Sequence, residues 1–305
     1  MLVLSEGVFK FAVGFRRFVL VVNLRSEGGN HEIATSTTLK IAKTFIKMTE
    51  EEIFKMKEAL ANHVVKATQH IVMIDPVTKL PSSGGSGCLI IYHDRLFLIS
   101  VQHVTDKVEK AACIDLGTDK SDGSDLYSLG SMNFIKQFEF SEFNASTPEL
   151  IELDPLDITY VEINGNIEVF QKEKKFDRYT ITEDNKRLLY TELTDTPNKE
   201  ERYSFFGRIR GKLKGSILEQ QEKLILGIHY DRKIGYFERF ILPETMIDPF
   251  GYKGTSGAPI ISETGAVVAF VASGKRGTKY LYGFSAVNLK TFLDIYIQQN
   301  PLEKA

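Results

Sequence analysis

Cysteine is scarce in this sequence, in which Cys88 and Cys113 are the only two among 305 residues. Two cysteines cannot build a disulfide framework, so the fold has to be stabilised by a hydrophobic core, which a chain of this length can form. Nothing in the sequence demands that the two cysteines pair, and this question stays open. The low cysteine content favours a reducing compartment, and we therefore predict a cytoplasmic location.

The sequence also has no large excess of charge of one sign and no long apolar run. The 38 basic residues nearly balance the 40 acidic ones, and a net charge of -2 gives no electrostatic signature of a nucleic-acid or anionic-membrane partner. Near the N-terminus, charged residues from Glu6 to Arg17 break the apolar stretch into pieces shorter than a membrane span, and no signal-peptide cleavage pattern follows. We expect neither a nucleic-acid partner nor a membrane segment.

Motifs for nucleotide cofactors and metals do not occur in the sequence. It contains no P-loop and no glycine-rich dinucleotide fingerprint. His70, His93 and His229 are scattered at spacings that do not suit a metal site, and Cys88 beside an apolar run is interpreted as a small buried hydrophobe. We therefore expect no cofactor and no metal.

The N-terminal region divides into two parts. Residues 1–47 contain a stretch rich in Gly, Ser, Thr and Asn and are predicted to form a poorly ordered extension. Thr49 and Glu52 then form a capping-box pattern, which predicts an N-terminal helix within residues 48–66. Because this helix begins directly after a methionine, translation could start at Met48, and N-terminal sequencing of the native protein would test this.

After residue 67 the pattern changes to short apolar runs separated by turn residues, which predicts β-strands. The runs are residues 70–74, 88–92, 95–101, 157–163, 202–209, 223–230, 236–242, 258–262, 266–273 and 279–287. Long helical patterns do not alternate with these runs, so a doubly wound α/β sheet is not favoured. Residues Asp115–Ser131 are predicted to form a polar loop, and Asn288 is the predicted N-cap of a short C-terminal helix, residues 288–299.

Three segments contain candidate catalytic residues. A glycine-flanked hairpin leads through an apolar strand to His103, Asp157 immediately precedes another apolar run, and Ser256 lies between Gly254 and Gly257. Taken singly, each also fits a structural role: a histidine after a buried strand, an aspartate at a strand edge, and an ordinary Gly/Ser turn. Glycines on both sides of Ser256, however, let neighbouring main-chain N–H groups converge on one point, as in an oxyanion hole.

Taken together, these segments resemble the trypsin-like serine peptidases over residues 65–299. The matching motifs are G-x-S-G-x-P around Ser256, S-x-x-H-V at Ser100–Val104 and D-I-T-Y-V at Asp157. The order His, Asp, Ser along the chain is also that of this family.

The resemblance implies an all-β fold of two six-stranded antiparallel β-barrels. The protease domain would span residues 67–299, with the first barrel at about 67–165, the second at about 200–287, and the active site in the cleft between them. A helix at each end of the domain completes the expected architecture.

The resemblance also implies a role for each candidate. Ser256 would be the nucleophile, His103 the general base and Asp157 the residue that orients His103, while the backbone N–H groups of Gly254 and Ser256 would form the oxyanion hole. The implied activity is that of a serine endopeptidase, which hydrolyses peptide bonds of a protein or peptide substrate through an acyl-enzyme.

The substrate pocket implied by the resemblance carries no charge, so it does not favour Lys or Arg, and an apolar or small side chain is the expected preference. Its residues would be Phe250, Gly251, Ala272, Ser273, Gly274 and Gly283.

The sequence departs from many family members at Thr255, where zymogen-derived enzymes carry an Asp that pairs with a freshly cut N-terminus. Activation by N-terminal cleavage is therefore not expected. Too few residues follow Ser256 for a carboxy-terminal PDZ module, so the chain looks like a bacterial or intracellular family type without PDZ domains.

Two other functions remain open at this stage. The first is a catalytically silent fold used as a binding or regulatory module, and the second is an esterase that uses the same triad. A regulatory partner is also possible: the extension 1–47 or the polar loop Asp115–Ser131 could restrain the active site or dock that partner.

Overall fold

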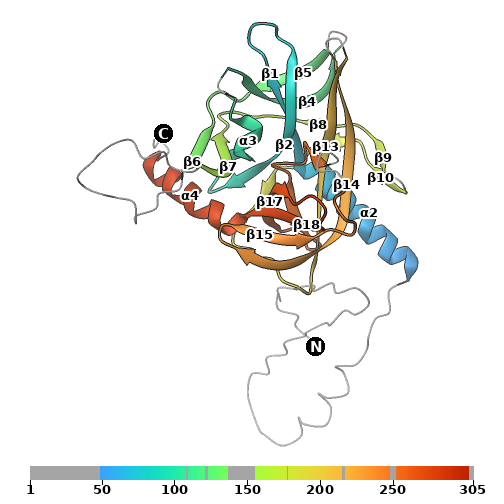
Figure 1. Cartoon of the computed structure of the whole chain (residues 1–305). Coiled ribbons are helices and arrows are strands. Elements are labelled where there is room, and N and C mark those ends of the chain that lie inside the picture. The colour runs from blue at the N-terminus through green and yellow to red at the C-terminus, as the bar shows by residue number, and fades with distance from the viewer. Residues whose placement is uncertain are drawn as a thin grey trace, which may run out of the picture.

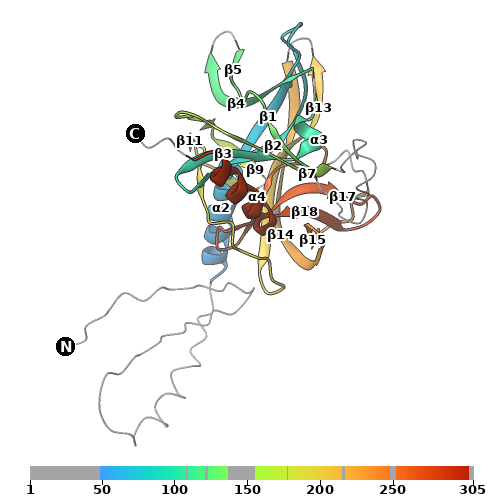
Figure 2. The same cartoon turned by 90° about the vertical axis from the view of Figure 1, so that its left-hand side faces the viewer.

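The computed structural model describes residues 49–107, 109–120, 123–136, 155–176, 178–214, 217–247 and 252–301. The predicted extension 1–47 and Met48 lie outside the described residues. Two β units face each other in this structure, one above the other in Figure 1, and the view turned by 90° in Figure 2 shows the same arrangement.

The first β unit is an antiparallel sheet with one additional parallel strand. In spatial order its strands are β5 (Gly123–Ser128), β4 (Ala111–Lys120), β1 (Thr68–Ile74), β2 (Pro81–Tyr92), β3 (Arg95–Ser100), β7 (Pro155–Glu162) and β6 (Asn133–Lys136). The short strand β12 (Leu189–Tyr190) pairs with β2 in parallel. Residues that link the units also form two small two-stranded sheets: β9 (Lys174–Phe176) pairs with β10 (Tyr179–Ile181), and β8 (Phe170–Gln171) pairs with β11 (Asp184–Asn185).

The second β unit is a closed six-stranded antiparallel barrel. Around the barrel its strands are β13 (Arg202–Lys214), β14 (Ile217–Ile234), β15 (Phe237–Ile241), β18 (Tyr280–Ser285), β17 (Val267–Gly274) and β16 (Pro259–Ser262). Phe205, Phe240 and Ile260 are fully buried and belong to one hydrophobic cluster. The apolar runs of the sequence therefore form the strands that they predicted.

Helices α2 (Glu50–Ala67) and α4 (Ala286–Gln299) flank the two units (Figure 1). Thr49 and Glu52 form the expected capping box, since the Thr49 hydroxyl accepts from the Glu52 N–H and the Glu52 carboxylate accepts from the Thr49 N–H. Val64 of α2 and Leu289 of α4 join one core cluster with Phe97 of the first sheet and Phe270 of the barrel. One shared core thus holds both helices and both β units together.

Three details of the predicted fold are corrected. The segment Asp115–Ser131 is not a loop in its described part, because β4 and β5 fold back on each other as a hairpin at the edge of the first sheet. With this hairpin and β12, the first unit has eight strands in the described residues where six were expected. The C-terminal helix begins at Ala286 and not at 288, so its N-cap is Ser285 and not Asn288, whose side chain donates to the Tyr236 carbonyl.

The long hairpin β13–β14 reaches beyond the barrel toward the first sheet, where charged side chains connect the two units. Arg208 of β13 donates to Asp115 of β4 at 2.7 Å and to Glu222 of β14 at 3.2 Å. Both carboxylates are largely buried, with side-chain exposures of 14% and 15%. Because Arg208 and Asp115 belong to different units, their largely buried ion pair forms part of the contact between the units.

The partly buried carboxyl group of Glu263 makes the stability of the folded protein depend on pH. Burial raises its pKa from the ordinary 4.5 to about 7, and its Oε2 atom has no hydrogen-bond partner in the described structure. Between these two pH values the folded state binds the proton more tightly than the unfolded state does, so stability falls as the pH rises through this window.

We expect Glu263→Gln to remove this fall in stability with rising pH. Relative to wild type, the variant should gain about 1–2 kcal/mol in the free energy of unfolding at pH 8 and nothing at pH 4. Urea unfolding at the two pH values measures the difference, and Glu244→Gln, which changes an exposed carboxylate, serves as the control. Parallel pH profiles of wild type and Glu263→Gln would contradict this assignment.

Among the described residues, no helix is both long enough and apolar enough to cross a membrane.

Candidate active site

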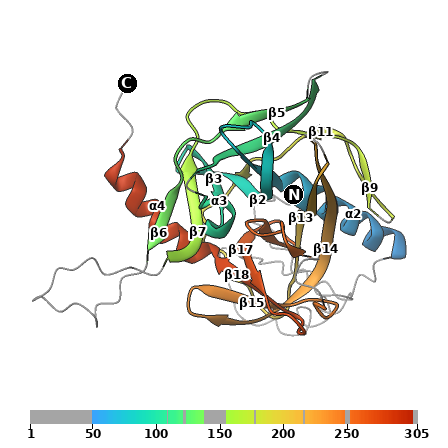
Figure 3. The ribbon, with the colours of Figure 1, turned by 45° about the horizontal axis from the view of Figure 1, so that its top comes forward.

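His103 lies in the short helix α3 (Gln102–Thr105), which directly follows β3. Its Nδ1 atom is 2.9 Å from each carboxylate oxygen of Asp157, and its backbone N–H donates to Asp157 Oδ1 at 3.2 Å. Asp157 lies in β7, which pairs with β3, and Figure 3 shows α3 beside β7. The structure thus brings these two predicted residues together.

The contact with Asp157 has a chemical consequence for the imidazole of His103. A carboxylate is an acceptor only, so Nδ1 carries a proton, and in the neutral imidazole the far nitrogen Nε2 is left as an acceptor. The His103 side chain is 51% exposed and that of Asp157 is 28% exposed, so the imidazole stays accessible while its partner is partly covered. This is the tautomer that a general base needs.

Ser256 lies in the tight loop that precedes β16, between two glycines with positive φ. Gly254 has a φ of 108° and Gly257 a φ of 87°. A Cβ atom would lie 2.1 Å from the Arg208 carbonyl oxygen at Gly254 and 2.0 Å from the Ser86 carbonyl oxygen at Gly257. Both positions therefore require glycine for conformation and for space.

Main-chain donors in this loop fall into two groups. The Thr255 N–H donates to the Tyr252 carbonyl at 3.0 Å, and the Gly257 N–H donates to the Val271 carbonyl at 2.7 Å. Within the described part of the chain, the N–H groups of Gly254 and Ser256 have no acceptor. The two predicted oxyanion-hole donors thus take no part in the main-chain hydrogen bonds that shape the described part of the loop.

The half-buried Ser256 side chain makes no hydrogen bond with His103 among the described residues. Their segments are connected instead by hydrogen bonds to the main-chain groups of Ser86. Ser86 N–H donates to the Ser256 carbonyl at 2.9 Å, and Ser100, three residues before His103, donates through its hydroxyl to the Ser86 carbonyl at 2.8 Å. Ser86 belongs to the G-S-G segment of the predicted hairpin and is not among the residues predicted to form the site.

Comparisons with known proteins gave matches among solved structures alone. No family model matches the chain, and no curated protein matches it. A serine endoprotease from Yersinia pestis is 9% identical over 80% of this chain and 66% of its own length, slightly below two thirds, with a TM-score of 0.46. Human heparin binding protein is 13% identical over 77% of this chain and 93% of its own length, with a TM-score of 0.43.

The order and pairing of the strands identify the fold independently of these low sequence identities and TM-scores. A closed antiparallel barrel follows an antiparallel sheet, the histidine lies in a short helix after β3, and α4 is the last helix of the described structure. The fold is trypsin-like. Its mostly antiparallel strands and its two terminal helices agree with the expectation from the sequence motifs.

Residues expected to line the substrate pocket of this trypsin-like fold have different environments. Phe250 and Gly251 lie outside the described residues. Ala272 is buried in the core, while Ser273 and Gly274 are exposed at the end of β17. A Cβ atom at Gly283 would point at Ile260 and Ala269 inside the barrel. A Cβ atom at Gly274 would clash with the end of Met246, which is 1% exposed and was not singled out from the sequence.

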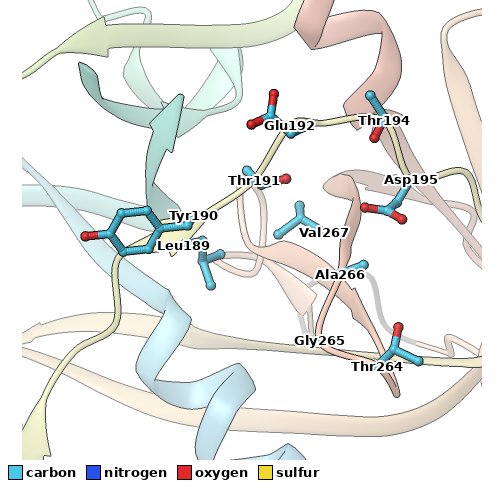
Figure 4. A pocket seen from close by; sticks show the side chains of 10 residues that line it. All are labelled: Leu189, Tyr190, Thr191, Glu192, Thr194, Asp195, Thr264, Gly265, Ala266 and Val267. Atoms are coloured by element: carbon cyan, nitrogen blue, oxygen red, sulfur yellow. The ribbon is translucent and has the colours of Figure 1, made fainter. Parts of the chain in front are cut away.

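A separate pocket of about 350 Å³ lies between residues 189–195 and residues 264–267 (Figure 4). It contains no member of the predicted triad or of the predicted substrate pocket, and we do not assign it to the candidate active site. In the described part of the trypsin-like fold, no group of three or more His, Cys, Asp or Glu side chains is placed to hold a metal ion. Both cysteines are free and buried, and burial raises the pKa of the Cys88 thiol.

Proposed function

We propose that this protein is a serine endopeptidase that uses His103, Asp157 and Ser256. The observation that supports this most directly is the contact of His103 Nδ1 with both oxygens of Asp157 at 2.9 Å. It occurs on adjacent elements of a trypsin-like fold, with an accessible imidazole and a glycine-flanked serine in the loop before β16.

In the first half of the proposed reaction, Ser256 Oγ attacks the carbonyl carbon of the scissile peptide bond. His103 Nε2 accepts the hydroxyl proton as the new C–O bond forms, and Asp157 stabilises the resulting imidazolium. The N–H groups of Gly254 and Ser256 donate to the oxyanion, and each such donor contributes about 3 kcal/mol to catalysis in comparable enzymes.

Collapse of the tetrahedral species breaks the C–N bond, and His103 returns its proton to the leaving amine. Water then attacks the acyl-enzyme with His103 again as the base, which releases the carboxylic acid product and restores the Ser256 hydroxyl. All proton transfers in this scheme use residues of the described structure. The substrate class that we propose is a protein or peptide.

Labelling with a fluorophosphonate probe tests the activated serine without knowledge of the natural substrate. We expect the wild-type chain to be labelled and tandem mass spectrometry to place the adduct on Ser256. Digestion of casein, followed by mass spectrometry of the fragments, then tests endopeptidase activity. Labelling and ester hydrolysis without any peptide cleavage would favour the esterase alternative.

The binding-module alternative makes the opposite prediction for the same experiment. A folded wild-type chain that takes up no probe at Ser256 and releases no casein fragments would contradict the proposed hydrolase. Circular dichroism on the same sample shows whether the protein was folded.

A further inference from the structure

Ser86 connects the first sheet to the loop that carries the proposed nucleophile. It lies in β2 and is 1% exposed. Its hydroxyl donates to the Gly254 carbonyl at 2.7 Å, while its backbone N–H donates to the Ser256 carbonyl at 2.9 Å. A single residue thus holds both residues whose N–H groups would bind the oxyanion.

Each peptide group of this loop from Gly254 to Gly257 is held by at least one hydrogen bond. The group between Gly254 and Thr255 is fixed at both ends, by Ser86 Oγ and by the Tyr252 carbonyl. The next group is fixed through the Thr255 carbonyl, which accepts from the Ala258 N–H at 2.9 Å. Its other end, the Ser256 N–H, is left unbonded in the described structure and is oriented by that bond.

The peptide group between Ser256 and Gly257 is again fixed at both ends. Its carbonyl accepts from the Ser86 N–H, and its N–H donates to the Val271 carbonyl at 2.7 Å. Ser86 therefore bonds the first and third of three consecutive peptide groups. Because each peptide group is planar, these two bonds fix the planes on either side of the Thr255–Ser256 group, whose N–H is that of Ser256.

Ser86 is itself held in one arrangement. The buried Ser100 hydroxyl donates to the Ser86 carbonyl at 2.8 Å. A Cβ atom on Gly207 would come within 3.0 Å of the Ser86 hydroxyl, and one on Gly257 within 2.0 Å of its carbonyl oxygen. Gly207 and Gly257 thus have no room for a side chain where they approach Ser86.

Ser100 also relates this contact to the other proposed catalytic residues. It ends β3 just before α3, which carries His103, and it pairs with Thr159 in β7, two residues after Asp157. The hydrogen bonds from Ser100 to Ser86 and from Ser86 to the loop thus set the position of Ser256, in the second unit, relative to the His103–Asp157 pair of the first.

We propose that Ser86 is a positioning residue that keeps the oxyanion hole formed in the uncleaved chain. This inference rests on the proposed function. Thr255 has no carboxylate to pair with a new N-terminus, and its hydroxyl donates instead to the Tyr252 carbonyl at 2.9 Å. In this proposal the Ser86 bonds to Gly254 and Ser256 hold the loop without such a pairing.

The first test is the reaction of Ser86→Ala with a fluorophosphonate, measured over a range of probe concentrations. We expect the maximal rate constant to fall about ten- to a hundredfold, since small misplacement of catalytic groups has effects of this size. The probe's apparent dissociation constant should change less than twofold, because the stabilised oxyanion is absent from the initial complex. An unchanged maximal rate constant in Ser86→Ala, with a reactive wild type, would overturn the proposal.

Ser204→Ala is the matched control for a lost buried hydroxyl. Ser204 is fully buried in β13, and its hydroxyl has no partner in the described structure. Removing such a group should leave both rate and stability nearly unchanged.

Hydrogen exchange separates this inference from the proposed activity, because it needs no reaction. In Ser86→Ala, the amides of Thr255 and Gly257 should exchange at least about tenfold faster than in wild type, with no change in Ser204→Ala. Equal exchange in all three proteins would overturn the proposal even if the wild type is active. Faster exchange in Ser86→Ala alone, with an unreactive wild type, would contradict the hydrolase but support the role of Ser86 in holding the loop.

Ser100→Ala provides a second variant if Ser86→Ala does not fold. It removes the hydroxyl that supports the Ser86 carbonyl but leaves both Ser86 bonds to the loop. We expect a smaller change in the same direction in exchange and in the maximal rate constant. Wild-type values for both quantities in folded Ser100→Ala, with Ser86→Ala unfolded, would overturn the proposal.

Discussion

Replacement of Ser256 by Ala is expected to lower peptide hydrolysis at least about 10⁴-fold and to abolish fluorophosphonate labelling. The substitution removes the one oxygen that forms the acyl-enzyme, whereas the Gly254 and Gly257 conformations and the Ser86 bonds to the loop carbonyls need no Ser256 side chain. Folding should therefore be retained. Fragment release from casein and probe incorporation measure the two activities.

Ser204→Ala again serves as the control for a serine lost from the same barrel. It should keep the wild-type rate and the wild-type labelling. If Ser256→Ala still incorporated probe at the wild-type rate, the nucleophile would have to be another residue. The proposed triad would then be wrong even though the protein is a hydrolase.

Replacement of Asp157 by Asn is expected to lower the rate about 10⁴-fold, with little change in the fold. Asp157 Oδ1 accepts the His103 backbone N–H, and both carboxylate oxygens lie 2.9 Å from His103 Nδ1. In the variant, the Asn oxygen can keep the backbone bond, which turns its NH₂ group toward Nδ1. The imidazole then carries its proton on Nε2 and cannot accept the proton of Ser256.

Asp106→Asn is the control for this variant. Asp106 follows α3, is exposed, and accepts a hydrogen bond from Gln102, so the same change of charge is made close to His103. We expect its rate to stay within a fewfold of wild type. Similar losses in Asp106→Asn and Asp157→Asn would mean that local charge, and not the tautomer of His103, controls the rate.

Much of the fold could be predicted because its signals are local in sequence. Apolar runs such as 258–262 and 266–273 coincide with β16 and β17, where inward-facing side chains fill the barrel. The capping-box residues Thr49 and Glu52 are three positions apart, and their mutual bonds form within a single helical turn. Such features need no information about the rest of the chain.

The hairpin β4–β5 escaped prediction for the opposite reason. β5 is the last strand at one edge of the first sheet, and Leu126 in it is 40% exposed. An edge strand of this kind has no need of an alternating apolar pattern, so its polar residues look like a loop. The predicted N-cap at Asn288 was wrong for another reason. Its residue type suits an N-cap, but its side chain donates a tertiary hydrogen bond to the Tyr236 carbonyl.

The sequence by itself determined the strands of the barrel, the N-terminal capping box and the three residues proposed for catalysis, because motif and periodicity are properties of neighbouring positions. Only the tertiary structure placed His103 against Asp157 and connected Ser86 to Gly254 and Ser256. These contacts join segments far apart in the chain, and they depend on how β2, β3 and β7 pair and on how the first sheet meets the barrel. Sequence periodicity gives the face on which a side chain lies, but it does not give the partner strand or the hydrogen bond that the side chain will find there.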